Sequence, residues 1–236
     1  GNYLAQLGET WESGSDDDLF DGPRSVAFDS GGNIYVSDAG NHRIQVFDSS
    51  GTYSATIGVT GESGMDDAHF DTPRHIATDD SDNLYVADAG NHRIQIFDSS
   101  HNYAATIGVS GESGSDDDHF NWPMGVAGDT DHIYVADFYN HRLQIFDRAT
   151  RVYQNTVGTG SAGSGNDEFD HPSDVAVDSA GNVYVADQDN CRVQKFNSSL
   201  TYQRTFGTTG VPYLTDGYHY NEPADVAVDA SGNVGI

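Results

Sequence analysis

The sequence predicts an all-β fold made of repeated four-stranded sheets, and three observations support this. Short motifs recur every 49–51 residues, each unit contains four short stretches rich in Val, Ile, Tyr and Phe, and no stretch has the apolar period of an amphipathic helix. The chain has 236 residues, of which 36% are hydrophobic, so it can bury the core of one domain of this length.

Two motifs define the repeating unit. Asn41-His42-Arg43 returns at 91–93 and 140–142 and again, with cysteine in place of histidine, at 190–192, at spacings of 50, 49 and 50 residues. A proline recurs at spacings of 50, 50, 49 and 51 residues, at Pro23, Pro73, Pro123, Pro172 and Pro223. We therefore expect a single domain over residues 1–236. It has a leading strand over 1–8 and units that begin near 23, 73, 123, 172 and 223, the last of them incomplete.

The strands of the first unit are predicted at 25–29, 33–38, 43–48 and 53–58. The stretch 34–36 is apolar on both faces, which predicts a sheet covered on both sides by neighbouring sheets. An alanine recurs in the first strand of each unit, where a small residue fits the crowded innermost strand; the positions are Ala27, Ala77, Ala127, Ala176 and Ala227. A period near 50 with four strands is typical of a β-propeller.

The repeated pattern also resembles a known family. It reads Phe-x-x-Pro, a hydrophobic strand ending in Asp, Gly-Asn-x-Tyr-Val-x-Asp, and Asn-His-Arg-hydrophobic-Gln-x-Phe, and it resembles the NHL repeat over nearly the whole chain. The resemblance implies a propeller, usually of six blades. The strand pattern leaves two alternatives, a five-bladed ring with one thin blade or an incomplete six-bladed ring, and an unclosed ring would favour self-association.

The charge excludes some partners. Asp and Glu number 37 against 10 Lys and Arg, giving a net charge of -27, so the chain lacks the basic surface that nucleic acid binding requires. No apolar run approaches the ~18 residues of a membrane helix, so we expect no membrane insertion. The excess of Asp over Glu, with Lys195 as the one lysine, fits a halophilic-like surface, although turn-rich β proteins need Asp in any case.

The cysteine content and the amino terminus bear on location. Cys191 is the one cysteine of the sequence, which excludes an intrachain disulfide and a cysteine-rich zinc site. The sequence begins at Gly1 without a methionine, as a mature secreted form or an excised piece would. We expect an extracellular or cell-surface location.

An aspartate and an arginine flank the second-to-third-strand turn of each unit, in the pairs Asp38–Arg43, Asp88–Arg93, Asp137–Arg142 and Asp187–Arg192. They are interpreted as structural staples, which pair bidentately across the turn, in preference to a ring of ligand-binding arginines. His42, His92 and His141 in the same turns are equally interpreted as structural, because successive blades would hold them too far apart for one zinc ion.

Acidic loops precede a phenylalanine in the first four units, and we expect this phenylalanine to anchor the loop in the core. Their aspartates are candidate Ca²⁺ ligands, although a solvated acidic face is the preferred interpretation; they are Asp16, Asp17, Asp18, Asp66, Asp67, Asp116, Asp117 and Asp118.

The residues just after each proline differ between units while their surroundings repeat, which marks them as candidate ligand-binding residues at the mouth of the central channel. The polar members are Arg24, Arg74, His75, Asp174 and Asp225. Their mixed charges suit a small polar or zwitterionic ligand. The alternative is sequence drift at an exposed rim.

These observations favour a non-enzymatic scaffold with an acidic top face that binds a protein or a small polar ligand, without catalytic residues or a required cofactor other than a possible Ca²⁺. The alternative is a metal-dependent lyase or hydrolase similar to peptide-amidating lyases or lactonase-like propellers. Those lyases hold a central metal with several histidines, whereas His75 is the one histidine expected at the inner rim.

Overall fold

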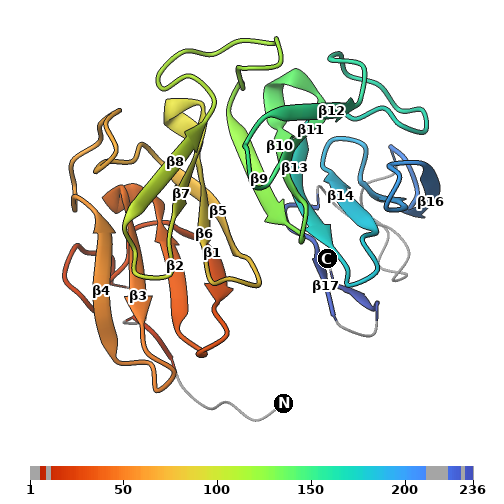
Figure 1. Ribbon diagram of the computed structural model, residues 1–236. Coiled ribbons are helices and arrows are strands. Elements are labelled where there is room, and N and C mark those ends of the chain that lie inside the picture. The colour runs from red at the N-terminus through yellow and green to blue at the C-terminus, as the bar shows by residue number, and fades with distance from the viewer. Residues whose placement is uncertain (1–5, 9–11, 211–222, 230–231, 236) are drawn as a thin grey trace.

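In the computed structural model, residues 6–8, 12–210, 223–229 and 232–235 are described, and over these residues the chain forms β-strands and three short 3-10 helices (Figure 1). Within the same residues, no helix has the length and apolar character needed to cross a membrane. The all-β prediction is confirmed.

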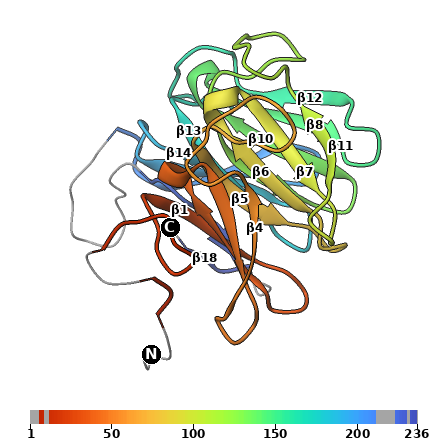
Figure 2. The same cartoon turned by 90° about the vertical axis from the view of Figure 1, so that its left-hand side faces the viewer.

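Four antiparallel sheets of four strands follow one another along the chain, and we call them blades 1 to 4 (Figures 1 and 2). Blade 1 consists of β1 (Pro23–Phe28), β2 (Ile34–Asp38), β3 (Arg43–Phe47) and β4 (Tyr53–Gly58), and blade 2 of β5 (Pro73–Thr78), β6 (Leu84–Asp88), β7 (Arg93–Phe97) and β8 (Tyr103–Ile107). Blade 3 consists of β9 (Pro123–Gly128), β10 (His132–Asp137), β11 (Arg142–Asp147) and β12 (Tyr153–Val157), and blade 4 of β13 (Pro172–Val177), β14 (Val183–Asp187), β15 (Arg192–Phe196) and β16 (Tyr202–Gly207). A two-stranded sheet of β17 (Ala227–Val228) and β18 (Val234–Gly235) comes last.

Local chemistry fixes the turns within a blade. In the loop from β1 to β2, Asp29 Oδ1 accepts the backbone N–H of Asn33 at 2.8 Å, and the Tyr35 hydroxyl donates to Asp29 Oδ2 at 3.2 Å. The turn from β2 to β3 is one 3-10 turn, η1 (Ala39–Asn41), and it ends at His42 with φ 54°. Asp and Asn suit such turns because their side chains bond the nearby backbone.

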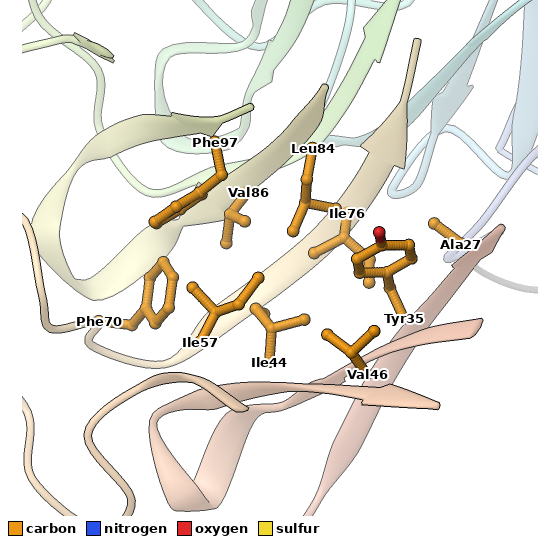
Figure 3. Packing of buried hydrophobic residues seen from close by; sticks show 10 residues of the cluster. All are labelled: Ala27, Tyr35, Ile44, Val46, Ile57, Phe70, Ile76, Leu84, Val86 and Phe97. Atoms are coloured by element: carbon orange, nitrogen blue, oxygen red, sulfur yellow. The ribbon is translucent and has the colours of Figure 1, made fainter. Parts of the chain in front are cut away.

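The core lies between successive blades. Ile44 and Ile57 of blade 1 pack against residues of the next unit, including Phe70, Ile76 and Val86 (Figure 3). Equivalent clusters lie between blades 2 and 3 and between blades 3 and 4. Because each inner blade has a neighbour on both sides, its strands are apolar on both faces. The stretch 34–36 itself lies in blade 1, which shares a described core cluster with a neighbouring blade on one side alone.

The first strands of successive blades contact one another, β1 with β5, β5 with β9 and β9 with β13. Each of the five recurring alanines lies on a first strand, from Ala27 on β1 to Ala227 on β17. The first strands β1, β5, β9 and β13 each begin with a proline. Their proline ends therefore lie in the same inner region, where the candidate site forms.

The two ends of the array differ from the inner blades. Val26 on β1 is 54% exposed, whereas its equivalents Ile76, Val126 and Val175 are 0–1% exposed under the preceding blade. The last sheet packs on blade 4, with Val226 against Tyr184 and Val193. Of the predicted leading strand over 1–8, residues 1–5 lie outside the described residues, and 6–8 form no strand.

Candidate functional site

A β-bulge follows the proline at the start of the first strands. The pairing register shifts between Pro23 and Ser25, between Pro73 and Ile76, and between Pro172 and Asp174. A bulge changes the direction in which the side chains of the extra residue and its neighbours point. The side chains after each proline therefore point in a direction that they would not take in a regularly paired strand.

These bulges surround one cavity of about 320 Å³, which we call the mouth cavity. Its lining consists of Arg24, Ser25, Arg74, His75, Met124, Ser173, Asp174, Gln188, Ala224 and Asp225. All five polar residues predicted for the channel mouth thus meet at one place. The guanidinium groups come from β1 and β5, and the carboxylates come from β13 and from the segment just before β17, so the two signs of charge enter from different blades.

His75 lines the cavity and contacts both Val126 of the next blade and Asp174. Its Nδ1 lies 3.1 Å from the carbonyl oxygen of Val126, which can only accept a hydrogen bond. The same Nδ1 lies 3.5 Å from the backbone nitrogen of Val126, and Nε2 lies 3.5 Å from Asp174 Oδ1. Burial lowers the pKa of His75, against the opposing charge of Asp225 and the bond to Val126, so the ring is neutral near pH 7.

Asp174 is the most deeply buried charged group of the cavity, at 1% exposure. Its Oδ2 accepts the N–H of Val226 at 3.0 Å, whereas its Oδ1 has no hydrogen-bond partner within the described residues. Burial above all, and then the neighbouring carboxylate of Asp225, raise the pKa of Asp174 well above its usual value. Gly125 permits this arrangement, because a Cβ there would lie 2.5 Å from the Asp174 Cα.

The two arginines of the cavity come from β1 and β5. Arg74 is partly buried, its Nε has no hydrogen-bond partner in the described part of the chain, and its guanidinium carbon lies 5.8 Å from the centre of the Trp122 ring. Burial, followed by the charge of Arg24, lowers the pKa of Arg74. An anionic group between Arg24 and Arg74 would relieve both effects.

The residues at these bulges also have a structural role that the sequence interpretation missed. Ser25 Oγ accepts the N–H of Ile76 in the next blade at 3.3 Å, and His75 Nδ1 and Asp174 Oδ2 make corresponding contacts with the backbone nitrogens of Val126 and Val226, at 3.5 Å and 3.0 Å. Each contact joins residues 51 or 52 positions apart, and that shared spacing is the one signal in the sequence that pointed to it. In Asp174 one carboxylate oxygen performs this role, and the other, Oδ1, has no hydrogen-bond partner within the described residues.

The aspartate–arginine pairs lie across their own turns, but a single bond joins each pair. Arg43 Nε donates to Asp38 Oδ2 at 2.8 Å, and the equivalent bonds in blades 2 to 4 measure 2.7–2.8 Å. The remaining nitrogens of Arg43 donate to the carbonyl oxygens of Ser15, Asp16 and Leu19 in the acidic loop. The expected bidentate geometry is therefore wrong, because the loop carbonyls take the other donors and the arginine fixes the loop as well as the turn.

The turn histidines connect neighbouring units. The Nδ1 atoms of His42, His92 and His141 accept the N–H groups of Thr72, Trp122 and His171 at 3.0–3.2 Å. Each histidine has φ between 49° and 55°. The three lie at three separate junctions between units, and no described cluster brings them together around one point.

The acidic loops turn their carbonyl groups inward, toward the arginines, and their carboxylates outward. Phe70 and Phe120 are fully buried against Phe97 and Phe146, with ring centres 5.7 Å apart, so they anchor these loops. Asp66 Oδ1 bonds His69 Nδ1 at 2.6 Å. Among the described residues, no three of the candidate Ca²⁺ aspartates converge on one point.

A family model of the NHL repeat matches residues 20–47, 70–97, 120–146 and 169–196. The chain is an NHL-repeat protein. The matched segments contain the paired aspartates and arginines and four of the five polar cavity residues, and Asp225 lies outside them. A search of curated protein sequences finds no match to the chain.

Solved structures with the same arrangement of sheets are distant in sequence from this NHL-repeat chain. One is titled hydrazine synthase of Kuenenia stuttgartiensis, with a TM-score of 0.58 and 14% identity over 85% of this chain and 52% of that chain. Another is titled a streptogramin B lyase structure, with a TM-score of 0.57 and 11% identity over 92% of this chain and 68% of that one. The chain thus spans about half the length of the first of these, and the likeness establishes a propeller-like fold alone.

A second cluster of titratable residues lies at the junction of blades 3 and 4. His171 Nδ1 lies 2.8 Å from Asp189 Oδ2 and 3.0 Å from Asp170 Oδ1, while His141 Nδ1 accepts the backbone N–H of His171. Each of these ring nitrogens already has a partner, whereas Asp174 Oδ1 at the mouth cavity has no hydrogen-bond partner within the described residues. The mouth cavity is therefore the better candidate site of this NHL-repeat protein.

Proposed function

We propose that this protein is a non-enzymatic binding propeller that holds a small zwitterionic ligand in the mouth cavity. The observation that carries the proposal is the presence of both signs of charge in one cavity, with Arg24 and Arg74 from β1 and β5 and with Asp174 and Asp225 from β13 and the segment before β17. A plain anion would meet the two carboxylates, and a plain cation would meet the two guanidinium groups. A ligand with both charges satisfies both sides.

Two buried polar atoms support a ligand of this kind. Arg74 Nε and Asp174 Oδ1 have no hydrogen-bond partner in the described residues, although buried polar groups are nearly always bonded. A carboxylate of the ligand beside Arg74 and a cationic group beside Asp174 would satisfy both. The wall also contains the uncharged residues Ser25, Met124, Ser173, Gln188 and Ala224, and the cavity of about 320 Å³ leaves room for a compact ligand.

A calorimetric comparison tests the proposal. A panel of free L-α-amino acids is titrated into the protein, and the tightest binder is compared with its amide, which lacks the carboxylate, and its N-acetyl form, which lacks the ammonium. We expect both derivatives to bind at least tenfold more weakly, and Arg74→Gln and Asp174→Asn to weaken the parent amino acid. Arg151→Gln is the matched control, because Arg151 is exposed in the loop between β11 and β12. The proposal is contradicted if Arg74→Gln and Asp174→Asn both leave the affinity unchanged, or if no amino acid of the panel binds.

The second candidate function is a metal-dependent lyase or hydrolase. The observation in its favour is that ligand atoms of His75, Asp174 and Asp225 all lie within 4.8 Å of one another, a donor set of one nitrogen and two carboxylates that divalent cations accept. One structural neighbour is titled a lyase. Tight binding of Mn²⁺ or Zn²⁺ that is lost in His75→Gln would favour this candidate over the zwitterion scaffold.

A further inference from the structure

Three aromatic side chains of one unit lie beside the mouth cavity, and they bear on the side chain of the ligand. They are Trp122, which precedes the proline of β9, and Phe138 and Tyr139 in the 3-10 turn η3 (Phe138–Asn140), and we call them the aromatic rim. Resting on the proposed function, we propose that the charged groups of the zwitterion lie in the mouth cavity and that its side chain packs on the aromatic rim. The ligand class is then an α-amino acid with an aromatic side chain.

The aromatic rim breaks the repeat at two places. The residue before the first-strand proline is Trp122 in this unit, whereas the other units have Gly22, Thr72 and His171. The turn between the second and third strands begins with Phe-Tyr in this unit and with Ala-Gly in the first two, although the Asp before the turn and the Asn within it are the same in all four. Blades 1 and 2 form the same four-stranded sheet without these rings, so the fold of a blade does not require them.

Tyr139 takes the place of a glycine that the equivalent turn needs. A Cβ at Gly90 would lie 2.6 Å from the carboxyl carbon of Asp71 and 2.8 Å from its carbonyl oxygen. Asn121 replaces this aspartate in blade 3, and the N–H of Tyr139 donates to the Asn121 carbonyl oxygen at 3.1 Å, compared with 2.9 Å in the equivalent bond of Gly90. Tyr139 is 52% exposed, so its ring adds little to the core and is accessible to a ligand.

Arg74 connects the aromatic rim with the cavity. It lines the cavity, and its guanidinium carbon lies 5.8 Å from the centre of the Trp122 ring. Burial and then Arg24 lower the pKa of Arg74 and Tyr139 opposes them, which agrees with a position of Tyr139 close to this guanidinium. A planar guanidinium can bond a carboxylate along its edge and stack an aromatic ring on its face. The carboxylate and the ring of one aromatic amino acid can therefore both contact Arg74.

His171 connects the aromatic rim with a second part of the cavity wall. Its ring centre lies 4.6 Å from that of Phe138 and 5.7 Å from that of Tyr139, and its carbonyl oxygen accepts the N–H of the cavity residue Gln188 at 3.3 Å. Asp189 Oδ2 lies 2.8 Å from His171 Nδ1 and fixes the imidazole. Phe138 and Tyr139 are thus held by ring contacts in the ligand-free protein, which lowers the entropic cost of binding.

An aromatic side chain suits these surroundings better than an aliphatic or a cationic one. Rings attract one another in edge-to-face and offset arrangements, and a ring beside Arg74 gains a cation–π contact that an aliphatic side chain lacks. A cationic side chain would meet the positive charge of Arg74. The Met124 side chain, two residues after Trp122, lines the cavity and can contact the same ring through its sulfur.

Calorimetry of L-phenylalanine and L-alanine tests the inference, because the two amino acids share their charged groups and differ by the ring. We expect L-phenylalanine to bind the wild type at least about tenfold more tightly than L-alanine. Trp122→Thr and Tyr139→Gly install the residues of the second unit, Thr72 and Gly90, and each should reduce this ratio to below about threefold. Tyr103→Ala is the matched control, because Tyr103 is an exposed tyrosine of β8, and it should leave the ratio unchanged.

Three results would overturn the inference. A ratio below about threefold in the wild type rejects contact between the side chain and the aromatic rim. A wild-type ratio that survives in both Trp122→Thr and Tyr139→Gly does the same. Tighter binding of β-cyclohexyl-L-alanine than of L-phenylalanine rejects the aromatic class. Each of these results leaves zwitterion binding intact, since L-alanine tests it alone, whereas failure of every amino acid to bind rejects the proposed function as well.

Tryptophan fluorescence locates the ligand ring without a change to the aromatic rim. The sequence has two tryptophans, so Trp11→Phe leaves Trp122 as the one emitter. p-Nitro-L-phenylalanine, which quenches a nearby tryptophan, should quench this emission with the dissociation constant that calorimetry gives, and excess L-phenylalanine should restore the emission. If the bound nitro compound leaves Trp122 emission unchanged, the ring does not lie on the aromatic rim and the inference fails.

Discussion

The buried Arg93 joins three parts of the protein around blade 2. Arg93 is 1% exposed and its donors meet Asp88, the carbonyl oxygens of Met65, Asp66 and His69, and the hydroxyl of Ser110. These groups belong to the turn between β6 and β7, to the acidic loop and to the loop after β8. A planar guanidinium can satisfy all of them at once, whereas a lysine ammonium has three donors and no fixed fork.

We predict that Arg93→Ala lowers the free energy of unfolding by about 3–5 kcal/mol, because it leaves the Asp88 carboxylate buried without its cation and frees several loop carbonyls. Arg93→Lys should recover little of this loss. Chemical denaturation followed by tryptophan fluorescence measures the effect, with Arg151→Ala as the exposed control. An unchanged unfolding midpoint in Arg93→Ala would show that the pair and its loop contacts contribute nothing to stability.

The pH dependence of stability should reflect the ionisation of the Asp174 carboxyl group. Its pKa in the folded protein is raised above the unfolded value of ~3.9, so its contribution to stability is complete below about pH 4 and is lost as the pH rises through the folded pKa. Asparagine cannot ionise. We therefore predict that the melting temperature of Asp174→Asn minus that of the wild type grows more positive from pH 4 to pH 8.

Circular dichroism melts at each pH measure this difference. Asp131→Asn is the control, because Asp131 is an exposed loop residue, and its difference should stay constant. A difference for Asp174→Asn that is flat or that falls with rising pH contradicts the assignment of a buried, protonated carboxyl group.

At the scale of strands, the close approach of β9 and β13 depends on one glycine. A Cβ at Gly125 would lie 2.5 Å from the Asp174 Cα and 3.0 Å from the backbone nitrogen of Val175, and backbone atoms cannot rotate away as a flexible side chain can. The two first strands must separate to admit a methyl group. The inter-blade spacing and the shape of the mouth cavity are therefore coupled at this position.

Gly125→Ala should destabilise the protein by about 1–3 kcal/mol through overpacking, and it should weaken amino acid binding as β13 moves. Gly128→Ala on the same strand is the matched control, since its Cβ would meet the edge of the Tyr85 ring at 3.3 Å. Thermal unfolding and calorimetry of both variants give the comparison. Equal effects of the two substitutions on stability and on binding would contradict a particular role for the close contact between β9 and β13.

For the whole molecule, charge repulsion opposes the compact state. With a net charge of -27, we predict that the melting temperature rises between 0.01 M and 1 M NaCl, as the Debye length shrinks from ~30 Å to ~3 Å. The same melts in KCl separate screening from specific ion binding. A melting temperature that is flat or falls over this range contradicts the halophilic interpretation, and a jump with millimolar Ca²⁺ alone would favour cation binding by the acidic loops.

Exposed apolar side chains on β1 of blade 1 should promote self-association. Val26 and Phe28 are 54% and 60% exposed, although the positions equivalent to Val26 in blades 2 to 4 are buried by the preceding blade. We predict that the 236-residue chain associates as its concentration rises, and that Val26→Asp reduces the association. Sedimentation velocity measures it, with Val152→Asp as control, because Val152 is 58% exposed in the loop before β12. A wild type that stays monomeric at millimolar concentration contradicts the prediction.

The sequence by itself determined the repeating architecture. Recurrent prolines and Asn-His-Arg motifs set the length of the unit, and apolar residues on both faces of stretches such as 34–36 required a neighbour on each side. The arginine positions, the turn histidines and the residues that break the repeat after each proline were all visible as patterns. The same residues recur at a fixed spacing because each unit packs against the next in the same way.

Only the tertiary structure decided which atoms of those residues remain unbonded. The sequence marks His75, Asp174 and Asp225 as different from their equivalents, but it does not reveal that Val126 and Val226 in following units occupy His75 Nδ1 and Asp174 Oδ2. Those contacts depend on the bulge at each first strand and on the close approach that Gly125 permits. These three residues, some 50 to 150 positions apart in the chain, reach one cavity because the first strands of the blades face the same centre. Contacts over such separations cannot be predicted from the local sequence around each residue.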